Sequence, residues 1–417
     1  MKKLVINGNK ELSGEIHIGG AKNSVVALIP ASCLTKGVSV IKNVPDISDV
    51  AMLIKIMEHL GSKITYENEV LTIDNKNLKS VAIPPEYSTS LRASYYFMGS
   101  LVGQFKKVEI SCPGGCTIGA RPIDIHLHSF KKQGIKVTEI DGNYTLNAKK
   151  IKGDEIFFDF PSVGATINVM LSSVLAEGTT KIINAAREPE IKNVAEFLIS
   201  MGAKITGAGT AEITIHGVDE LHGGEVTVMP DRIEAGTYLI IGALLGKNLT
   251  ISGVNRDHLV SLTSKLDDAG VKLKIDKSKI VVSRTKSLKA INIKTSVYPG
   301  FPTDLGQPMS AFLTQCKGES VFEETIYENR LRHIPYLMTM GARIQSWDKK
   351  AMIFGPSKLK GRKVKATDLR AGASLLVAGM IATGTTEVFN IEHLLRGYEN
   401  LVDKLNACGA DIKLIDY

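Results

Sequence analysis

The sequence has few cysteines, few aromatic residues and no long apolar run. Five cysteines in 417 residues are a sparse and odd-numbered set, which argues against a disulfide framework. No apolar run reaches the roughly 18 residues of a membrane helix, so a membrane protein is not expected. The first twenty residues contain two lysines but no apolar core and no cleavage site. We therefore expect no signal peptide and predict a cytoplasmic protein.

The net charge is positive. Lys and Arg number 51 and Asp and Glu 43, which gives +8. Such a balance is found in proteins that bind nucleic acids, membrane surfaces or anionic small molecules. Nucleic-acid binders usually cluster their charge, whereas the basic residues here are spread along the chain. A solvated surface is the simplest interpretation; a non-catalytic nucleic-acid-binding module, with steeply salt-dependent binding, is an alternative.

An internal repeat is the most informative pattern. Six pentapeptides related to MGAKI each carry a glycine, and these glycines lie 68 to 73 residues apart: Gly61, Gly134, Gly202, Gly270, Gly341 and Gly409. A second series runs ahead of the first: Gly37, Gly103, Gly178, Gly246, Gly318 and Gly384. Six units of about 70 residues thus account for nearly the whole chain.

Each unit predicts the same order of elements. It opens with a helix that is apolar on all sides and therefore expected to be buried, as in 24–34, 165–176, 237–245 and 373–382. The first glycine is expected to end this helix in a left-handed conformation, and a β-branched strand follows. An amphipathic helix (194–201 in unit three), the second glycine and another strand complete the unit. This alternation predicts α/β units with largely parallel strand pairing.

The simplest division of the chain is three units plus three, with a boundary near Pro230 and Asp231. The opening stretch, 3–18, resembles a hairpin and could pair with either half. Two similar lobes with a cleft between them are the expected architecture, and such a cleft is the usual place for a small-ligand site.

The second unit differs from the other five. Its two glycines are 31 residues apart, against 23 to 25 elsewhere, and the excess lies in CPGGCTIGARPIDIH at 112–126. An insertion confined to one repeat maps to a loop that is often functional. Cys116, between a glycine pair and Arg121, is a candidate reactive thiol. Cys33, Cys316 and Cys408 lie in apolar helical segments and are interpreted as buried and inert.

Basic residues recur at related positions of the units. Arg330 and Arg396 each come 12 residues after their unit's first glycine, while Arg92, Arg370 and Lys22 lie near the starts of first helices. If these positions face one cleft, the cations converge there with helix N-termini. That arrangement suits a substrate with phosphate and carboxylate groups. Taken singly, each could equally be a surface residue.

Asp304 precedes the first helix of unit five, as Asp231 and Asp368 precede those of units four and six. The shared place favours helix N-capping for the group. Only Asp304 stands in a loop rich in Pro and Gly, which could carry it toward the cleft. A carboxylate there could deprotonate a substrate hydroxyl.

Eight motifs together resemble one enzyme family. They are GGAKNS (19–24), PGGCTIGARPIDIH (113–126), SVGAT (162–166), REPEI (187–191), FPTDLGQP (301–308), ENR (328–330), DLRAG (368–372) and RGYE (396–399). The whole chain resembles UDP-N-acetylglucosamine 1-carboxyvinyltransferase, the enolpyruvyl transferase family of bacterial peptidoglycan synthesis. The alternative enzyme is 5-enolpyruvylshikimate-3-phosphate (EPSP) synthase, a family that shares the fold but lacks the cysteine loop.

The resemblance implies an EPSP synthase-like fold, a two-lobed inside-out α/β barrel with helices inside and three of the six units in each lobe. The N-terminal lobe would be 22–229 and the C-terminal lobe 1–21 plus 230–417, because in the family the N-terminal strands complete the C-terminal lobe. The implied reaction transfers the enolpyruvyl group of phosphoenolpyruvate to the 3′-hydroxyl of UDP-N-acetylglucosamine by addition and elimination, and releases phosphate.

This would be the first committed step of peptidoglycan biosynthesis, with consequences for cell shape and division. The resemblance implies no metal and no organic cofactor. The implied partners are the two small substrates, with no nucleic acid and no membrane. The sequence makes no prediction of the oligomeric state.

The resemblance also implies residue roles. Cys116 would be the general acid, could bond covalently to phosphoenolpyruvate and would be the thiol that fosfomycin alkylates. Lys22, Arg121 and Arg396 would hold the phosphate. Asp304 would accept the proton of the sugar hydroxyl, and Arg330 and Arg370 would stabilise the carboxylate side and the developing charge. The residues that would position the UDP-sugar are Asn23, Arg92, Arg121, Pro122, Ile123, Asp124, Ile125, Ser162, Val163 and Ile326.

The sequence departs from the family in one place. Some members carry a lysine two residues before SVGAT, where this chain has Phe160 followed by Pro161. The nucleotide contact of that lysine is therefore absent here.

Overall fold

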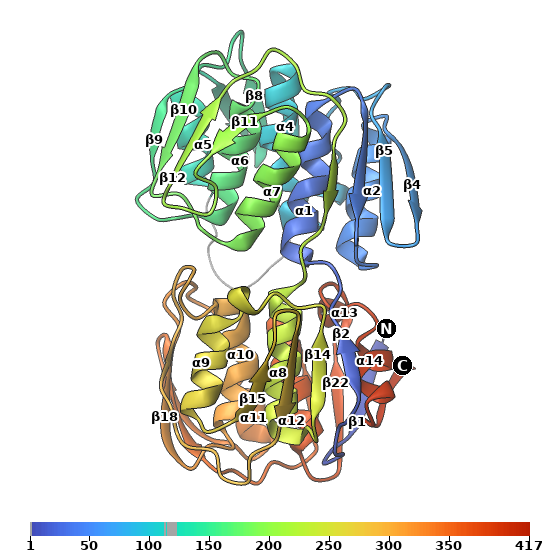
Figure 1. Ribbon diagram of the computed structural model, residues 1–417, viewed down its shortest axis with the longest axis vertical. Coiled ribbons are helices and arrows are strands. Elements are labelled where there is room, and N and C mark those ends of the chain that lie inside the picture. Colours follow the sequence, from blue (N-terminus) through green and yellow to red (C-terminus); the bar gives the residue numbers. More distant parts are fainter. Residues whose placement is uncertain (1, 112–113, 115–122) are drawn as a thin grey trace. The chain divides into compact units, whose positions relative to one another are not determined.

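The computed structural model describes residues 2–111, 114 and 123–417. The described part of the chain forms two compact units (Figure 1). The N-terminal unit comprises described residues from 20 to 229, and the C-terminal unit comprises residues 2–19 and 230–417. None of the helices described is both long enough and apolar enough to cross a membrane.

The strands of the N-terminal unit form three of the six sheets found among the described residues. The first sheet has the order β13 (Glu225–Thr227), β3 (Val38–Lys42), β5 (Val70–Asp74), β4 (Lys63–Glu67). The second is β6 (Lys107–Ser111), β8 (Asn143–Asn147), β7 (Lys136–Ile140). The third is β11 (Lys204–Thr206), β12 (Glu212–His216), β10 (Thr179–Ile183), β9 (Glu155–Phe157).

The C-terminal unit contains the other three sheets. The first is β15 (Lys272–Ile275), β16 (Lys279–Ser283), β14 (Leu249–Ser252), β2 (Glu15–His17). The second is β17 (Ile293–Lys294), β18 (Gly318–Glu323), β20 (Lys350–Gly355), β19 (Arg343–Trp347). The third is β21 (Lys363–Lys365), β22 (Thr385–Phe389), β1 (Lys2–Asn7), β23 (Ile412–Asp416).

The predicted parallel pairing was wrong. In the sheet of unit three, β10 pairs in parallel with β9 but antiparallel with β12, and β12 pairs antiparallel with β11. The strand after the second glycine turns back in a hairpin, and the second strand of that hairpin separates it from the first strand of the unit. The four-stranded sheets all combine one parallel pair with two antiparallel pairs, and in the sheet of unit six β1 takes the place of the second hairpin strand.

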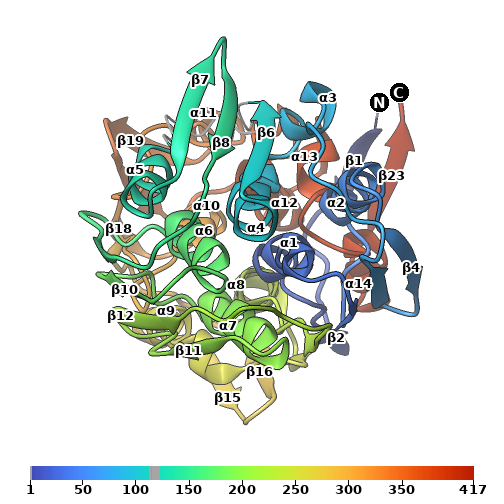
Figure 2. The same cartoon turned by 90° about the horizontal axis from the view of Figure 1, so that it is seen from above.

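The first helix of each repeat lies in the core of its unit, as predicted. These helices are α1 (Lys22–Ala31), α4 (Tyr96–Phe105), α6 (Val163–Ser173), α8 (Arg232–Leu245), α10 (Thr303–Leu313) and α12 (Leu369–Ile381). α4 packs against α1 and α6, while α8, α10 and α12 all pack against one another. Figure 2 looks along α1, α4 and α6 and shows strands outside them. The inside-out arrangement of helices and sheets is therefore present in both units.

The remaining helices connect strands or begin loops. The longer ones are α2 (Ser48–His59), α5 (Asp124–Lys132), α7 (Pro189–Ser200), α9 (Val260–Asp268), α11 (Ile334–Thr339) and α14 (Leu401–Ala407). The short ones are η1 (Ser32–Leu34), α3 (Pro85–Ser88), η2 (Arg92–Tyr95), η3 (Arg256–His258) and α13 (Glu392–Leu395). The apolar face predicted for 194–201 is buried in α7 and the residue after it.

The repeat glycines serve two purposes. The second glycine of every unit has a positive φ, between 81° and 107°, and ends its helix as predicted. In the first series this holds for Gly178, Gly318 and Gly384 but was wrong for Gly37, Gly103 and Gly246. Gly103 lies inside α4, where a Cβ atom would come 2.8 Å from the carbonyl oxygen of Leu171 in α6. This glycine permits close helix packing instead of a left-handed turn.

The stretch 3–18 is not a hairpin. β1 pairs antiparallel with both β22 and β23, whereas β2 pairs in parallel with β14. The two N-terminal strands therefore complete two different sheets, both in the C-terminal unit.

Candidate active site

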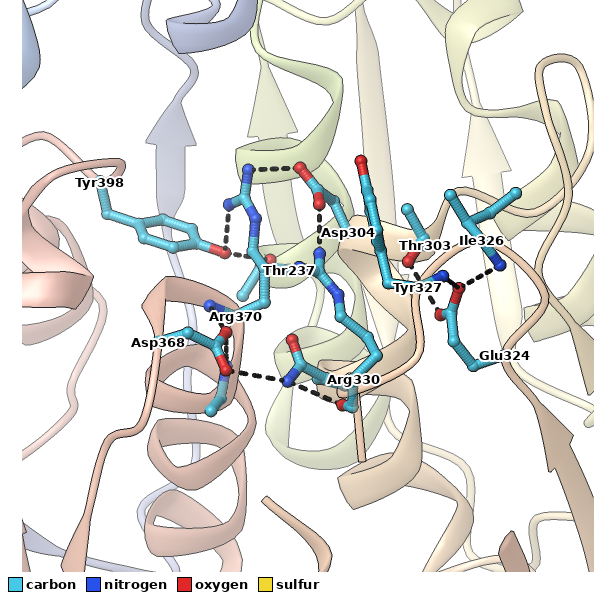
Figure 3. A network of polar contacts seen from close by, with 12 residues as sticks. Thr237, Thr303, Asp304, Glu324, Ile326, Tyr327, Arg330, Asp368, Arg370 and Tyr398 are labelled. Carbon is cyan, nitrogen blue, oxygen red and sulfur yellow. Dashed lines mark hydrogen bonds and ion pairs between the residues drawn. The ribbon is translucent and has the colours of Figure 1, made fainter. Parts of the chain in front are cut away.

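The Asp304 carboxylate forms ion pairs with two arginine side chains in the C-terminal unit (Figure 3). Its Oδ1 accepts a hydrogen bond from Nη2 of Arg330, and its Oδ2 lies 2.8 Å from Nη2 of Arg370. The two arginine side chains are 3% and 5% exposed, whereas the Asp304 side chain is 25% exposed. The structure thus brings together three residues that the sequence places 26 and 66 positions apart.

Asp304 and Arg370 are positioned by the first turns of two helices. Asp304 is the second residue of α10 and Arg370 is the second residue of α12, and these two helices pack together. Asp304 does not cap α10, whose N-cap is Pro302, so the capping interpretation was wrong for this residue. It was right for the two related aspartates. Asp368 Oδ1 accepts from the backbone N–H groups of Arg370 and Ala371, each at 3.0 Å, and the Asp231 side chain caps α8.

Tyr398 supports Arg370 and was not singled out from the sequence, although it stands in the RGYE motif. Its hydroxyl lies 3.3 Å from Nη1 of Arg370 and 2.8 Å from Oγ1 of Thr237. The Arg370 guanidinium carbon is 5.7 Å from the centroid of the Tyr398 ring. Burial alone would lower the pKa of Arg370, but the charge and hydrogen bond of Asp304, together with Tyr398 and Asp231, outweigh burial and the net shift is upward. Arg370 is therefore a permanently charged group held in one place.

The backbone of Arg330 is fixed by a buried amide. Nε2 of Gln307 donates to the carbonyl oxygen of Arg330 at 3.0 Å and lies 3.5 Å from Oδ2 of Asp368. His333 is buried nearby, and burial lowers its pKa to about 4. A neutral imidazole therefore stands beside this arginine at physiological pH.

Ile326 and Arg396 also belong to the C-terminal unit. The backbone N–H of Ile326 donates to Oε1 of Glu324 at 2.7 Å. Arg396 is the C-cap residue of α13 and is partly buried, two residues before Tyr398.

The predicted residues Lys22, Asn23 and Arg92 belong to the N-terminal unit. Lys22 begins α1, and its Nζ lies 3.0 Å from Oδ2 of the buried Asp49. Asn23 follows in the same helix and is partly buried. Arg92 begins η2, with its guanidinium carbon 5.8 Å from the ring centroid of Tyr95.

Ser162 and Val163 lie where α6 starts in the N-terminal unit. Ser162 is the N-cap, and its Oγ accepts a hydrogen bond from the backbone N–H of Ala165 at 3.3 Å. Val163 is the first residue of the helix. The sequence reasoning had not identified this capping role.

The end of the insertion in unit two leads into α5. Ile123 precedes the helix and is buried, Asp124 is exposed, and Ile125 is partly buried. Nδ1 of the next residue, His126, lies 2.8 Å from Nδ2 of Asn168. Burial lowers the pKa of His126 to about 3, and the charge of Arg92 acts in the same direction. His126 is thus a neutral anchor for this segment.

The predicted residues Cys116, Arg121 and Pro122 lie outside the described residues, as does Cys112. The other cysteines, Cys33, Cys316 and Cys408, are buried, as predicted. Across the described ranges there is no group of three or more His, Cys, Asp or Glu side chains that could hold a metal ion.

Similarity to known proteins covers the full chain. Residues 6–405 match the EPSP synthase (3-phosphoshikimate 1-carboxyvinyltransferase) family. UDP-N-acetylglucosamine 1-carboxyvinyltransferase 2 of Streptococcus pyogenes serotype M1 is 50% identical over 418 residues, which cover 100% of both chains. This chain belongs to the UDP-N-acetylglucosamine 1-carboxyvinyltransferase family. The family member of the same name in Listeria monocytogenes is 48% identical over 98% of this chain and 97% of that one.

Solved structures agree with this assignment. The enolpyruvyl transferase NikO from Streptomyces tendae aligns with a TM-score of 0.91 at 26% identity and covers 99% of this chain and 98% of that chain. EPSP synthase from Acinetobacter baumannii aligns over 100% of both chains with a TM-score of 0.76 at 16% identity, a likeness of fold alone. The family resemblance seen in the motifs is confirmed, and so is the EPSP synthase-like fold.

Proposed function

We propose that this chain is a UDP-N-acetylglucosamine 1-carboxyvinyltransferase. It transfers the enolpyruvyl group of phosphoenolpyruvate to the 3′-hydroxyl of UDP-N-acetylglucosamine and releases phosphate, which begins peptidoglycan synthesis. The observation that carries this function is the 50% identity to enzymes of that name over the whole length of both chains. The pairing of Asp304 with two buried arginines supports it, because the reaction needs a base beside fixed cations.

The arginine pair suits an anionic substrate. Arg330 and Arg370 share Asp304 as a counter-ion, and that carboxylate is the most exposed member of the cluster. A carboxylate or phosphate that binds the guanidinium groups competes with Asp304 for their N–H donors. We infer that phosphoenolpyruvate takes over part of these contacts and leaves an Asp304 oxygen to accept a proton.

The proposed chemistry then has two steps. In the addition, the 3′-oxygen bonds to C2 of phosphoenolpyruvate, its proton passes to Asp304, and Cys116 gives a proton to C3. In the elimination, C3 returns a proton to the Cys116 thiolate, the bond between C2 and the phosphate oxygen breaks, and the phosphate leaves with the proton that Asp304 had taken up. Arg330 and Arg370 stabilise the charge that develops on the carboxylate side.

The other assignments follow the family. Lys22, Arg121 and Arg396 would hold the phosphate. The UDP-sugar would contact Asn23, Arg92, Arg121, Pro122, Ile123, Asp124, Ile125, Ser162, Val163 and Ile326. The two catalytic lobes would be 22–229 and 1–21 plus 230–417. We propose that the enzyme is cytoplasmic and has no nucleic-acid partner.

The test is phosphate release from phosphoenolpyruvate, measured with and without UDP-N-acetylglucosamine and after treatment with fosfomycin. Release should require both substrates and stop after alkylation. Release that survives alkylation would remove Cys116 from its role. Release with shikimate 3-phosphate in place of the UDP-sugar would assign the chain to the EPSP synthase activity instead.

A further inference from the structure

We propose that Glu324 is a positioning residue that holds Asp304 and the turn at Ile326 in one arrangement for enolpyruvyl transfer. The inference rests on the proposed function, in which Asp304 and Ile326 contact the UDP-sugar. It concerns how those two residues, 22 positions apart in the chain, are kept in register with each other.

Both oxygens of the Glu324 carboxylate are engaged (Figure 3). The residue follows β18 and is 1% exposed. Oε2 accepts a hydrogen bond from the hydroxyl of Thr303 at 2.8 Å. Oε1 accepts from the backbone N–H groups of Ile326 at 2.7 Å and Tyr327 at 3.1 Å. One rigid group thus joins the start of α10 to the turn after β18.

The charge of Glu324 is costly to bury, which argues for a specific role. Within the described residues it forms no ion pair, and its carboxylate is held by the three hydrogen bonds alone. A buried carboxylate without a cation is stabilised only when its oxygens accept well-placed hydrogen bonds. An apolar side chain would avoid this cost but could accept none of these hydrogen bonds.

The start of α10 differs from those of its neighbours in the way that this role requires. Asp231 and Asp368 cap α8 and α12 with their own side chains. The N-cap of α10, Pro302, makes no side-chain hydrogen bond, and the first helical residue, Thr303, is tied to Glu324. Because Thr303 immediately precedes Asp304 in the chain, its hydrogen bond to Glu324 fixes the direction in which the Asp304 side chain leaves the helix.

Oε1 of Glu324 acts on Arg330, the partner of Asp304, through Tyr327. Tyr327, whose backbone N–H binds Oε1 of Glu324, presents its ring 5.4 Å from the guanidinium carbon of Arg330. Arg330 in turn binds Asp304. Both members of the Asp304–Arg330 pair are thus held by neighbours that bind the same carboxylate.

The test compares Thr303→Val, which replaces the hydroxyl by a methyl group, with Thr303→Ser, which keeps the hydroxyl. We expect Thr303→Val to lower kcat about tenfold, since small misplacements of a catalytic group cost one to two orders of magnitude. KM of Thr303→Val for phosphoenolpyruvate should stay within about twofold of the wild-type value. Thr303→Ser should keep the kcat of the wild type. The control is Thr263→Val, whose hydroxyl binds only carbonyl groups of its own helical segment and whose loss should leave kcat unchanged.

Glu324→Ala removes the hydrogen bonds to Thr303 and to the turn at Ile326. This variant should also raise KM for the UDP-sugar. Adding Thr303→Val to Glu324→Ala should slow the enzyme no further, because Thr303 acts through Glu324. Wild-type kinetics in Thr303→Val, or equal loss in Thr303→Val and Thr303→Ser, would overturn the proposal. If the wild type itself releases no phosphate from the two substrates, the proposed function is refuted and this inference with it.

Discussion

Asp304 and Arg370 face each other from the second positions of two packed helices, with 2.8 Å between Oδ2 and Nη2. The arginine is nearly buried and the aspartate is partly exposed. The pair is therefore more accessible to solvent through Asp304, and in the proposed function a substrate anion would compete with Asp304 for the guanidinium group.

Asp304→Asn should abolish most of the activity and weaken the fold. Loss of a general base typically lowers the rate by 10² to 10⁴. Two nearly buried guanidinium groups would also lose their counter-ion, so the thermal midpoint should fall. Inorganic phosphate should raise the midpoint of the variant more than that of the wild type, which calorimetry can measure. The control is Asp268→Asn, from an exposed pair with Lys265, which should change the midpoint little.

Tyr398→Phe should reduce both stability and catalysis without unfolding the protein. The change deletes a buried hydroxyl that contacts Arg370 and Thr237, which costs about 1 kcal/mol of unfolding free energy. We expect kcat/KM to fall severalfold because Arg370 loses a restraint. Tyr66→Phe deletes a hydroxyl that binds the Val44 carbonyl and is the control. Equal effects of both variants on kcat/KM would contradict a special role for Tyr398.

The repeats explain why much of the fold could be predicted and why the capping interpretation of Asp304 was wrong. Six copies of one pattern average out local ambiguity, so buried first helices and helix-ending second glycines were predicted correctly. The same averaging grouped Asp304 with Asp231 and Asp368. Whether an aspartate is the N-cap or the second helical residue is a matter of two positions, which a motif cannot resolve. The hairpin strands were missed because a short strand after a turn gives little periodicity, as in β12.

Glu234 should make stability depend on pH. It is 4% exposed, and burial raises its pKa from 4.5 to about 7 although Nζ of Lys404 lies 2.8 Å away. The folded state therefore binds this proton more tightly, and stability from Glu234 is lost as the pH rises from about 4.5 to about 7. The unfolding free energy of Glu234→Gln minus that of the wild type should thus increase by up to about 3 kcal/mol between pH 5 and 8.

Urea unfolding at several pH values checks the sign of this change. Glu225→Gln, from an exposed pair with Lys42, is the matched control, and its difference from the wild type should vary much less. A difference for Glu234→Gln that decreases with pH would show that the buried carboxylate is stabilising when charged.

Thiol reagents should discriminate among the cysteines. Burial raises the pKa of Cys33 far above its usual value, that of Cys316 to about 12, and that of Cys408 to a lesser extent. Thiols with so little thiolate react slowly. Brief treatment of the folded protein with N-ethylmaleimide or fosfomycin, followed by peptide mapping, should place adducts in 112–116 and none on these three. An adduct on Cys408 that forms as fast as one on Cys116 would contradict the expectation.

The pairing of β1 with β22 and β23 has a consequence for biosynthesis. Leu4 leaves the ribosome long before its partners Val388 and Leu414, by roughly 20 to 80 s at ordinary translation rates. The three sheets of the N-terminal unit can meanwhile form, since all of their strands lie between Val38 and Thr227. An apolar strand thus waits, unpaired, until synthesis is almost complete. The nascent chain therefore exposes an unpaired apolar strand early in synthesis. We expect chaperones to bind this segment.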